Sequence, residues 1–369
     1  MKTYLLKRFF LIIPTFLGIT LITFFIIKLA PGSPISIKVQ AAEGVKAQSV
    51  SKEIIEQMKK LYGLDTPLPG WYEHFIHRTN ALLFGVTDVE QRNLFRKTAE
   101  WVGENWIQYT RWLKRVVKFD FGESFKDHRP VIQKIKEALP ITLTLNVIEL
   151  LIVYFISVPL GVFSALRRES LIDKAVMVNL FILYSLPTFW VATILIMVFA
   201  SGDHLNWFPI VGWVSDGAET LPWYKWLGNV AWHLVLPVTC MVYGSFAFLS
   251  RFSRANMLEV IRQDYIRTAK AKGLPRRTVI WKHAFRNSLI PLVTLMGTLL
   301  PALMGGSVII EQIFSIPGMG KLGFESVLAR DYPTIMAIAS IEALLTLVSL
   351  LISDIAYVWV DPRISFGKL

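Results

Sequence analysis

Six long apolar runs, separated by segments rich in charge, restrict this 369-residue chain more than any other feature of its sequence. The hydrocarbon core of a membrane is about 30 Å thick, and an apolar helix of about 20 residues crosses it. Runs of that length lie at residues 9–29, 140–165, 175–200, 232–250, 288–310 and 334–359. Hydrophobic residues make up 53% of the chain, more than a soluble domain carries. We therefore predict an all-α polytopic membrane protein with six transmembrane helices.

Four prolines interrupt these runs, and each predicts a kink within a span. They are Pro159, Pro187, Pro237 and Pro301. Proline removes a backbone hydrogen bond from a helix, but neighbouring groups in a membrane protein can satisfy the freed carbonyl. The six predicted spans therefore include bent helices.

Basic residues beside the runs indicate how the spans are oriented. Lys7 and Arg8 precede the first run, Arg167 follows the second, and Arg251 follows the fourth. Short loops that carry Lys and Arg stay in the cytoplasm, whereas a loop as long as residues 31–139 is exported regardless of its charge. With six spans, both termini then lie in the cytoplasm.

This topology divides the chain into three parts. Residues 1–30 form an N-terminal tail and the first helix, residues 31–139 form a large insertion or small cap on the outer side of the membrane, and residues 140–369 form a five-helix core with a cytoplasmic loop at 251–287. The insertion has a helix-like stretch at 51–61 and carries four tryptophans, Trp71, Trp101, Trp106 and Trp112. These aromatic residues fit either a small folded cap or side chains that lie at the membrane surface.

Polar residues within the apolar runs form a second pattern. Glu342, Thr346 and Ser349 are spaced to share one face of the last span, and Asn146 and Glu149 share a face of the second. A charge at the bilayer centre costs about 3 kcal/mol on insertion scales, so these residues should face other helices or a wet cavity. They fit the wall of a transport pathway or hydrogen bonds between helices.

The basic loop at 251–287 predicts a helix, a turn and a second helix. Residues 261–272 can form the first helix. Gly273 can end it in a left-handed conformation with positive φ, and Pro275 prevents the helix from continuing. Charge alone would fit a solvated connecting loop equally well.

The sequence lacks the motifs expected of several other functions. Gly318-Met-Gly-Lys321 does not complete a Walker A loop, because Ser315 stands at its first glycine position and Leu322 replaces its Ser or Thr. The single cysteine, Cys240, excludes an internal disulfide and a cysteine-based metal site. The net charge of +12 comes without an aromatic-basic motif for nucleic acid. We expect no catalytic residue, cofactor, metal or nucleic acid in this chain.

The loop sequence Asp264-Tyr-Ile-Arg-Thr-Ala-Lys-Ala-Lys-Gly273, followed by Trp281-Lys-His-Ala-Phe-Arg-Asn-Ser-Leu-Ile-Pro291, resembles the cytoplasmic signature of the dipeptide/oligopeptide branch of binding-protein-dependent ABC permeases. Further similar motifs follow in order: Leu29-Ala-Pro-Gly-Ser-Pro34, Phe119-Asp-Phe-Gly-Glu-Ser124, Glu311-Gln-Ile-Phe-Ser-Ile-Pro-Gly-Met-Gly320, Ala329-Arg-Asp-Tyr-Pro333 and Asp361-Pro-Arg363. Within the family, the sequence looks most like the first permease of the oligopeptide and microcin C importers.

The resemblance implies a fold of the type I ABC importer kind in the bacterial inner (cytoplasmic) membrane. It implies a permease subunit that forms half of the pathway for peptides or peptide-like solutes. Its expected partners are a second permease, two ATP-binding subunits that supply ATP and Mg, and a periplasmic or lipoprotein substrate-binding protein. The residues expected to couple the chain to the ATP-binding subunits are Asp264, Tyr265, Arg267, Thr268, Ala269, Ala271, Lys272, Gly273 and Pro275.

An alternative is a proton-coupled secondary transporter in which Glu149, Glu342 and Asp354 relay protons. Such carriers often show an inverted repeat, and none is visible in this sequence. The loop signature also favours the ATP-driven importer.

Overall fold

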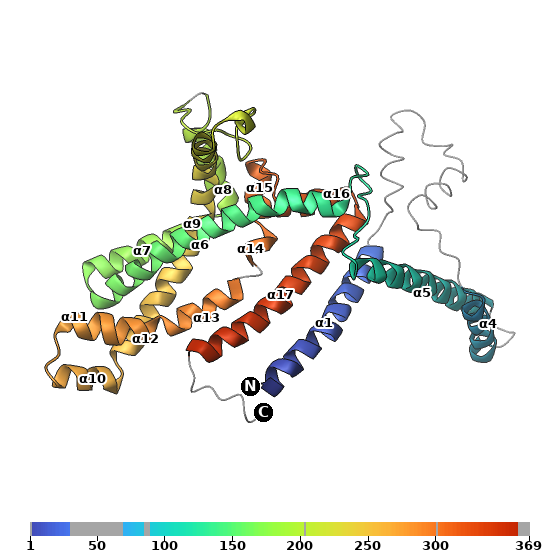
Figure 1. Ribbon diagram of the computed structural model, residues 1–369, viewed down its shortest axis with the longest axis horizontal. Coiled ribbons are helices and arrows are strands. Elements are labelled where there is room, and N and C mark those ends of the chain that lie inside the picture. Colours follow the sequence, from blue (N-terminus) through green and yellow to red (C-terminus); the bar gives the residue numbers. More distant parts are fainter. Residues whose placement is uncertain (1, 30–68, 85–88, 203, 300–301, 361–369) are drawn as a thin grey trace. The chain divides into compact units, whose positions relative to one another are not determined.

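The computed structural model describes residues 2–29, 69–84, 89–202, 204–299 and 302–360 (Figure 1). Across these residues the chain is helical apart from turns, and its one extended pairing is an isolated bridge between Glu123 and Pro130. The predicted all-α class is confirmed. The chain forms two compact units. The first comprises Met1–Ile13, Ile135–Phe324 and Leu344–Leu369, and the second comprises Pro14–Lys134 and Glu325–Ala343.

Four helices of the described residues are long and apolar enough to cross a membrane: α1 (Lys2–Leu29), α6 (Val131–Leu166), α9 (Trp223–Ile261) and α17 (Tyr332–Val360). The bent pair α7 (Leu171–Ser185) and α8 (Thr188–Phe199) is a fifth candidate. The run at 288–310 contains α12 (Arg286–Ser288), α13 (Ile290–Leu299) and α14 (Ala302–Gly305), and Pro301 lies outside the described residues. The polytopic class is confirmed, and the sixth span stays a prediction.

The third predicted span, residues 175–200, is wrong as a single helix because α7 and α8 meet at 93°. Pro187 precedes α8, and Leu186 before it is extended at φ −82° and ψ 126°. A residue before proline is pushed out of the helical region, which explains the break. The Tyr243 hydroxyl donates to the carbonyl of Leu186 over 2.8 Å, so the break leaves this carbonyl satisfied.

Helix α9 is the centre of the first unit. It contacts α7, α8, α12 and α15 (Val308–Ile313). Its residues Leu234, Val238 and Leu249 are buried in one apolar cluster with Leu145 of α6. At 39 residues α9 is about 58 Å long, well beyond the predicted span at 232–250. Residues 251–261, predicted as part of the basic loop, form its last turns.

The second unit contains two helices that the sequence left undefined, α4 (Gly70–Phe84) and α5 (Val89–Val116). The two helices contact each other, and Trp112 and Leu113 of α5 pack against a cluster that includes Phe24 of α1. Tyr109 of α5 is buried beside Phe24, and its hydroxyl lies 3.0 Å from that of Thr20. Trp71 and Trp106 are exposed, whereas the predicted stretch at 51–61 lies outside the described residues. The choice between a cap and surface aromatics therefore stays open.

A glycine allows α6 and α9 to cross closely. A Cβ atom added to Gly161 would lie 2.5 Å from the Ser250 carbonyl oxygen and 2.9 Å from the Arg254 nitrogen. Both are backbone atoms, so rotating a side chain cannot relieve the overlap. Nearby, the Ser253 hydroxyl of α9 donates to the Val158 carbonyl of α6 over 3.2 Å.

We predict that Gly161→Ala destabilises the protein by about 1–3 kcal/mol, the usual cost of overpacking. The measurement is the melting temperature of the purified protein in detergent. The matched control is Gly18→Ala in α1, where an added Cβ meets nothing within 4 Å. This control should melt no lower than the wild type, because alanine favours a helix over glycine. Equal melting temperatures for the two variants would contradict the close crossing.

Candidate functional site

The predicted loop contains α10 (Asp264–Ala271), and α11 (Arg276–Thr278) follows it. The expected helix at 261–272 is confirmed, except that it starts at Asp264 because α9 continues to Ile261. Gly273 has φ +73°, as the sequence predicted. Its N–H donates to the Lys270 carbonyl over 3.0 Å, and the Leu274 N–H donates to the Ala269 carbonyl over 3.3 Å. This pair of bonds is the Schellman arrangement that ends a helix at a left-handed glycine.

One face of α10 is anchored in the first unit. Ile266, 1% exposed, and Ala269 share a buried cluster with Val162 of α6 and Met257 of α9. The cluster also contains Ala165 of α6 and two residues of the π-helical stretch η2 (Val279–Phe285), Val279 and Ala284. Figure 1 shows α10 beside α11 and α12, and α10 contacts η2 directly. The helix is therefore held to the ends of two candidate spans by apolar contacts.

The other face of α10 is exposed. Among the nine residues predicted to couple the chain to a motor, Ala269 is buried and packs in the apolar cluster. The other eight are exposed: Asp264, Tyr265, Arg267, Thr268, Ala271, Lys272, Gly273 and Pro275. The pair between Arg267 and Asp264 spans 3.4 Å and is open to solvent, so it adds little stability. The outer face of α10 is therefore mostly polar and open to solvent.

An ion pair joins α7 to α9 next to this junction. Arg254 of α9 holds both carboxylate oxygens of Asp173, over 2.9 and 2.7 Å. The Ser164 hydroxyl and the Glu169 N–H also donate to Asp173, which is 4% exposed. Sequence reasoning missed this pair because its members lie 81 residues apart. The local signal was Ser170, whose hydroxyl caps α7 by accepting from the Asp173 N–H.

A second carboxylate, that of Glu311, is enclosed within the motif Glu311–Gly320. It accepts from the Thr142 hydroxyl over 2.9 Å and from the Lys321 N–H over 2.8 Å. A Cβ at Gly318 would lie 2.5 Å from the Glu311 carboxyl carbon. Burial raises the pKa of Glu311, and the hydrogen bonds from Lys321 and Thr142 oppose that rise. The motif therefore packs α15 and the start of α16 (Met319–Leu328) against α6.

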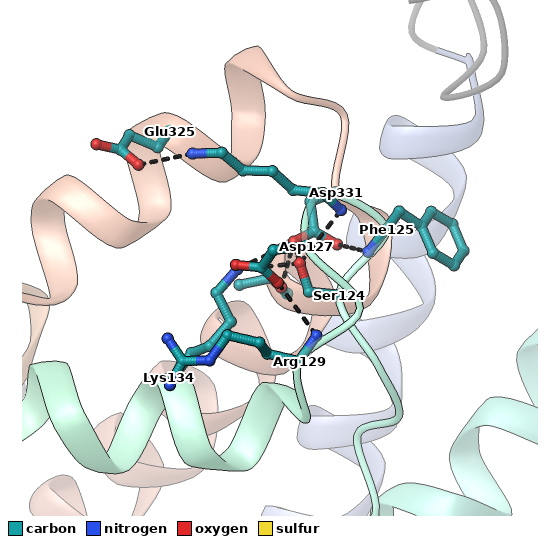
Figure 2. Close-up of polar contacts among 9 residues, drawn as sticks. Ser124, Phe125, Asp127, Arg129, Lys134, Glu325 and Asp331 are labelled. Atoms are coloured by element: carbon teal, nitrogen blue, oxygen red, sulfur yellow. Dashed lines mark hydrogen bonds and ion pairs between the residues drawn. The ribbon is translucent and has the colours of Figure 1, made fainter. Parts of the chain in front are cut away.

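A third carboxylate, that of Asp331, organises the second unit (Figure 2). It is fully buried and accepts from the Ser124 hydroxyl over 2.5 Å and the Phe125 N–H over 2.8 Å. The Lys134 ammonium lies 3.7 Å from Asp331 and 3.0 Å from Asp127. Two motifs quoted from the sequence, 119–124 and 329–333, thus meet in one polar cluster. Their spacing in the chain gave no sign of this contact.

A cavity of about 480 Å³ lies within the first unit. Its lining combines α6, α7, α9, α13 and α14 and consists of Asn146, Glu149, Leu150, Val153, Tyr154, Tyr184, Gly244, Ser245, Phe248, Leu249, Leu295 and Leu303. The Ser245 hydroxyl donates to Glu149 over 2.8 Å, and the Asn146 amide donates to the Leu303 carbonyl over 2.7 Å. The two predicted polar residues of α6 therefore meet at one cavity and also bond to neighbouring helices.

The polar residues of α17 are placed differently. Thr346 and Ser349 are not among the lining residues of this cavity, and Ser349 is buried. Glu342 is half-buried and belongs to the second unit. Of the predicted polar residues, Asn146 and Glu149 of α6 line this cavity. Within the described residues, no three His, Cys, Asp or Glu side chains are grouped as a metal site.

Comparison with known proteins identifies relatives over the full chain. Residues 157–366 match the family described as "Binding-protein-dependent transport system inner membrane component". The chain is 37% identical to the oligopeptide transport system permease protein AppB of Bacillus subtilis, over 99% of this chain and 100% of the relative. It is 34% identical to the dipeptide transport system permease protein DppB of Bacillus subtilis, over 100% of this chain and 99% of the relative. It is 32% identical to the inner membrane ABC transporter permease protein YejB of Escherichia coli O157:H7, over 99% of both chains.

We predict that Arg254→Met lowers stability by about 3 kcal/mol, because it leaves the buried Asp173 carboxylate unpaired. Arg254→Lys should lower the stability less, because lysine keeps the positive charge and loses only the bidentate hydrogen bonding to Asp173. The measurement is the melting temperature in detergent. Arg267→Met is the control, because its ion pair is exposed. If Arg254→Met and the control have the same melting temperature, the ion pair between Arg254 and Asp173 does not hold α7 to α9.

Proposed function

We propose a function for this chain on the basis of its family. The chain belongs to the family of binding-protein-dependent transport system inner membrane components. The chain is a permease subunit of an ABC importer, and its relatives include permeases of oligopeptide and dipeptide systems. We propose that it forms half of a translocation pathway for peptides or peptide-like solutes. The extent of the similarity, at 34–37% identity over nearly the full length of the AppB and DppB permeases, supports this substrate class.

The proposed assembly contains a second permease, two ATP-binding subunits and a periplasmic or lipoprotein substrate-binding protein. ATP and Mg belong to the ATP-binding subunits, since this sequence has no complete Walker A loop. The chain lies in the bacterial inner membrane with both termini in the cytoplasm. The basic residues at 251–287 support this orientation, because short basic loops remain on the cytoplasmic side.

The exposed face of α10 is the proposed docking surface for an ATP-binding subunit. The observation that carries the proposal is the division of α10 into a buried face at Ile266 and Ala269 and an exposed polar face. A partner that moves the exposed face also moves the ends of α6 and α9 that contact the buried face. Nucleotide-driven closure of the motor would then reach the spans as a rigid-body displacement.

The cavity at Asn146 and Glu149 is the proposed part of the pathway within this subunit. A pathway residue must face a space that a solute can enter, and these two residues meet that condition. Thr346, Ser349 and Glu342 are proposed to bond helices, because they do not line this cavity. The proton-coupled alternative is not retained, since family membership assigns the chain to ATP-driven importers.

We predict that Gly273→Val weakens docking of the ATP-binding subunits and lowers ATP-driven uptake. Valine at φ +73° costs about 1–2 kcal/mol, and a cost of that size changes an equilibrium by roughly 5- to 30-fold. The complex is reconstituted in proteoliposomes with its substrate-binding protein. Uptake of a labelled peptide and ATP hydrolysis stimulated by the binding protein are measured at equal subunit content. Both rates should fall together.

Gly217→Val is the matched control. Gly217 has φ +76°, precedes η1 (Ala218–Thr220), and an added Cβ meets nothing within 4 Å, as at Gly273. It therefore carries the same backbone strain at a site outside α10. ATP-binding subunits should co-purify normally with this variant. Equal retention of these subunits by both variants would contradict docking on α10. If vesicles that contain the wild-type complex show no ATP-driven uptake of any peptide, the proposed substrate class is contradicted.

A further inference from the structure

The cavity wall combines one acidic side chain with an apolar and aromatic surround. Glu149 lies near the midpoint of α6 and is half-buried. The lining includes three aromatic residues, Tyr154, Tyr184 and Phe248, and otherwise mainly aliphatic ones. A carboxylate in such surroundings loses hydration, so a charged or hydrogen-bonding partner stabilises it strongly.

The described residues supply little of that stabilisation. The Ser245 hydroxyl donates to one oxygen of Glu149 over 2.8 Å. A carboxylate has about four acceptor positions on its two oxygens. Within the described part of the chain, the ion pairs do not include Glu149. Asp173 and Asp331, in contrast, each accept at least two hydrogen bonds and lie near a basic side chain.

The space beside Glu149 admits a ligand group. Gly244 lines the cavity, and a Cβ added there would meet nothing within 4 Å. A primary ammonium carries three N–H donors and is attracted both to a carboxylate and to aromatic faces. The lining therefore offers the two kinds of partner that an ammonium group prefers.

We propose that this cavity is a binding site for the primary ammonium group of a solute in transit, with the Glu149 carboxylate as its charged partner. This proposal rests on the proposed function, because it names the chemical group that a peptide-like substrate would present to the pathway. Binding of the ammonium group at Glu149 is weak and transient, because a solute in transit must also leave the site.

Glu149 could instead serve only to join α6 to α9 through Ser245. A bond between helices does not depend on whether a solute carries an ammonium group. The two roles therefore differ in how the reactivity of Glu149 responds to charged and neutral solutes of the same shape.

The test uses the assembled wild-type importer in vesicles without ATP. Dicyclohexylcarbodiimide, which modifies carboxyl groups in apolar surroundings, is added with trialanine or with N-acetyl-trialanine, which lacks the ammonium group. Mass spectrometry measures the labelled fraction of Glu149 over time. Trialanine should slow labelling at least threefold, and N-acetyl-trialanine should not. Equal labelling with both peptides, or a Glu149 that is never labelled, would overturn the proposal.

Two controls locate the effect. Glu342, a half-buried carboxyl outside the cavity lining, should label at one rate with either peptide. Gly244→Leu should fill the space and abolish protection of Glu149 by trialanine, and retained protection would contradict binding in this cavity. The wild-type comparison decides the proposal if that variant fails to assemble. Because labelling needs neither ATP nor the substrate-binding protein, ATP-driven uptake by the same vesicles tests the permease function separately.

Discussion

The burial of Ile266 between the ends of α6 and α9 is the contact on which the proposed mechanism depends. Helix α10 has eight residues, too few to be stable alone in water. Its direction is therefore set by the apolar cluster on its inner face and by the turn at Gly273. Tertiary packing holds this short helix in place, and the same packing would transmit displacement of its outer face to the spans.

Four carboxylates of the two units differ in their surroundings: three are enclosed by hydrogen-bond donors, and one borders a cavity. Asp173, Glu311 and Asp331 each accept several hydrogen bonds from side chains and backbone amides, and each fixes neighbouring segments together. Glu149 accepts one bond from the residues that the structure describes, and it borders a cavity. A buried polar group is costly unless it is satisfied, so the enclosed carboxylates are explained by structure alone. The exposure of Glu149 to the cavity is what supports a role in binding a passing solute.

The sequence predicted the features that depend on local pattern. Hydropathy gave the positions of α1, α6, α9 and α17, and glycine chemistry gave the left-handed turn at Gly273. It did not predict the 93° break at Pro187, because a proline in a membrane helix causes either a mild kink or a complete interruption. The bonds of Asp173 to Arg254 and of Asp331 to Ser124 join residues far apart in the chain, and one sequence carries no pairing signal for them.

The most direct test of the central claim is whether α10 and α9 move together. Spin labels are placed at exposed Arg251 of α9 and at exposed Lys270 of α10, which is not among the predicted coupling residues, after replacement of the single cysteine, Cys240. Double electron–electron resonance spectroscopy then measures the distance between the two spin labels in the assembled importer, with and without bound ATP. Rigid-body coupling predicts that the separation stays constant while the ATP-binding subunits close. A change of about 5 Å, one helical turn, would contradict it, because α10 would then move without the spans.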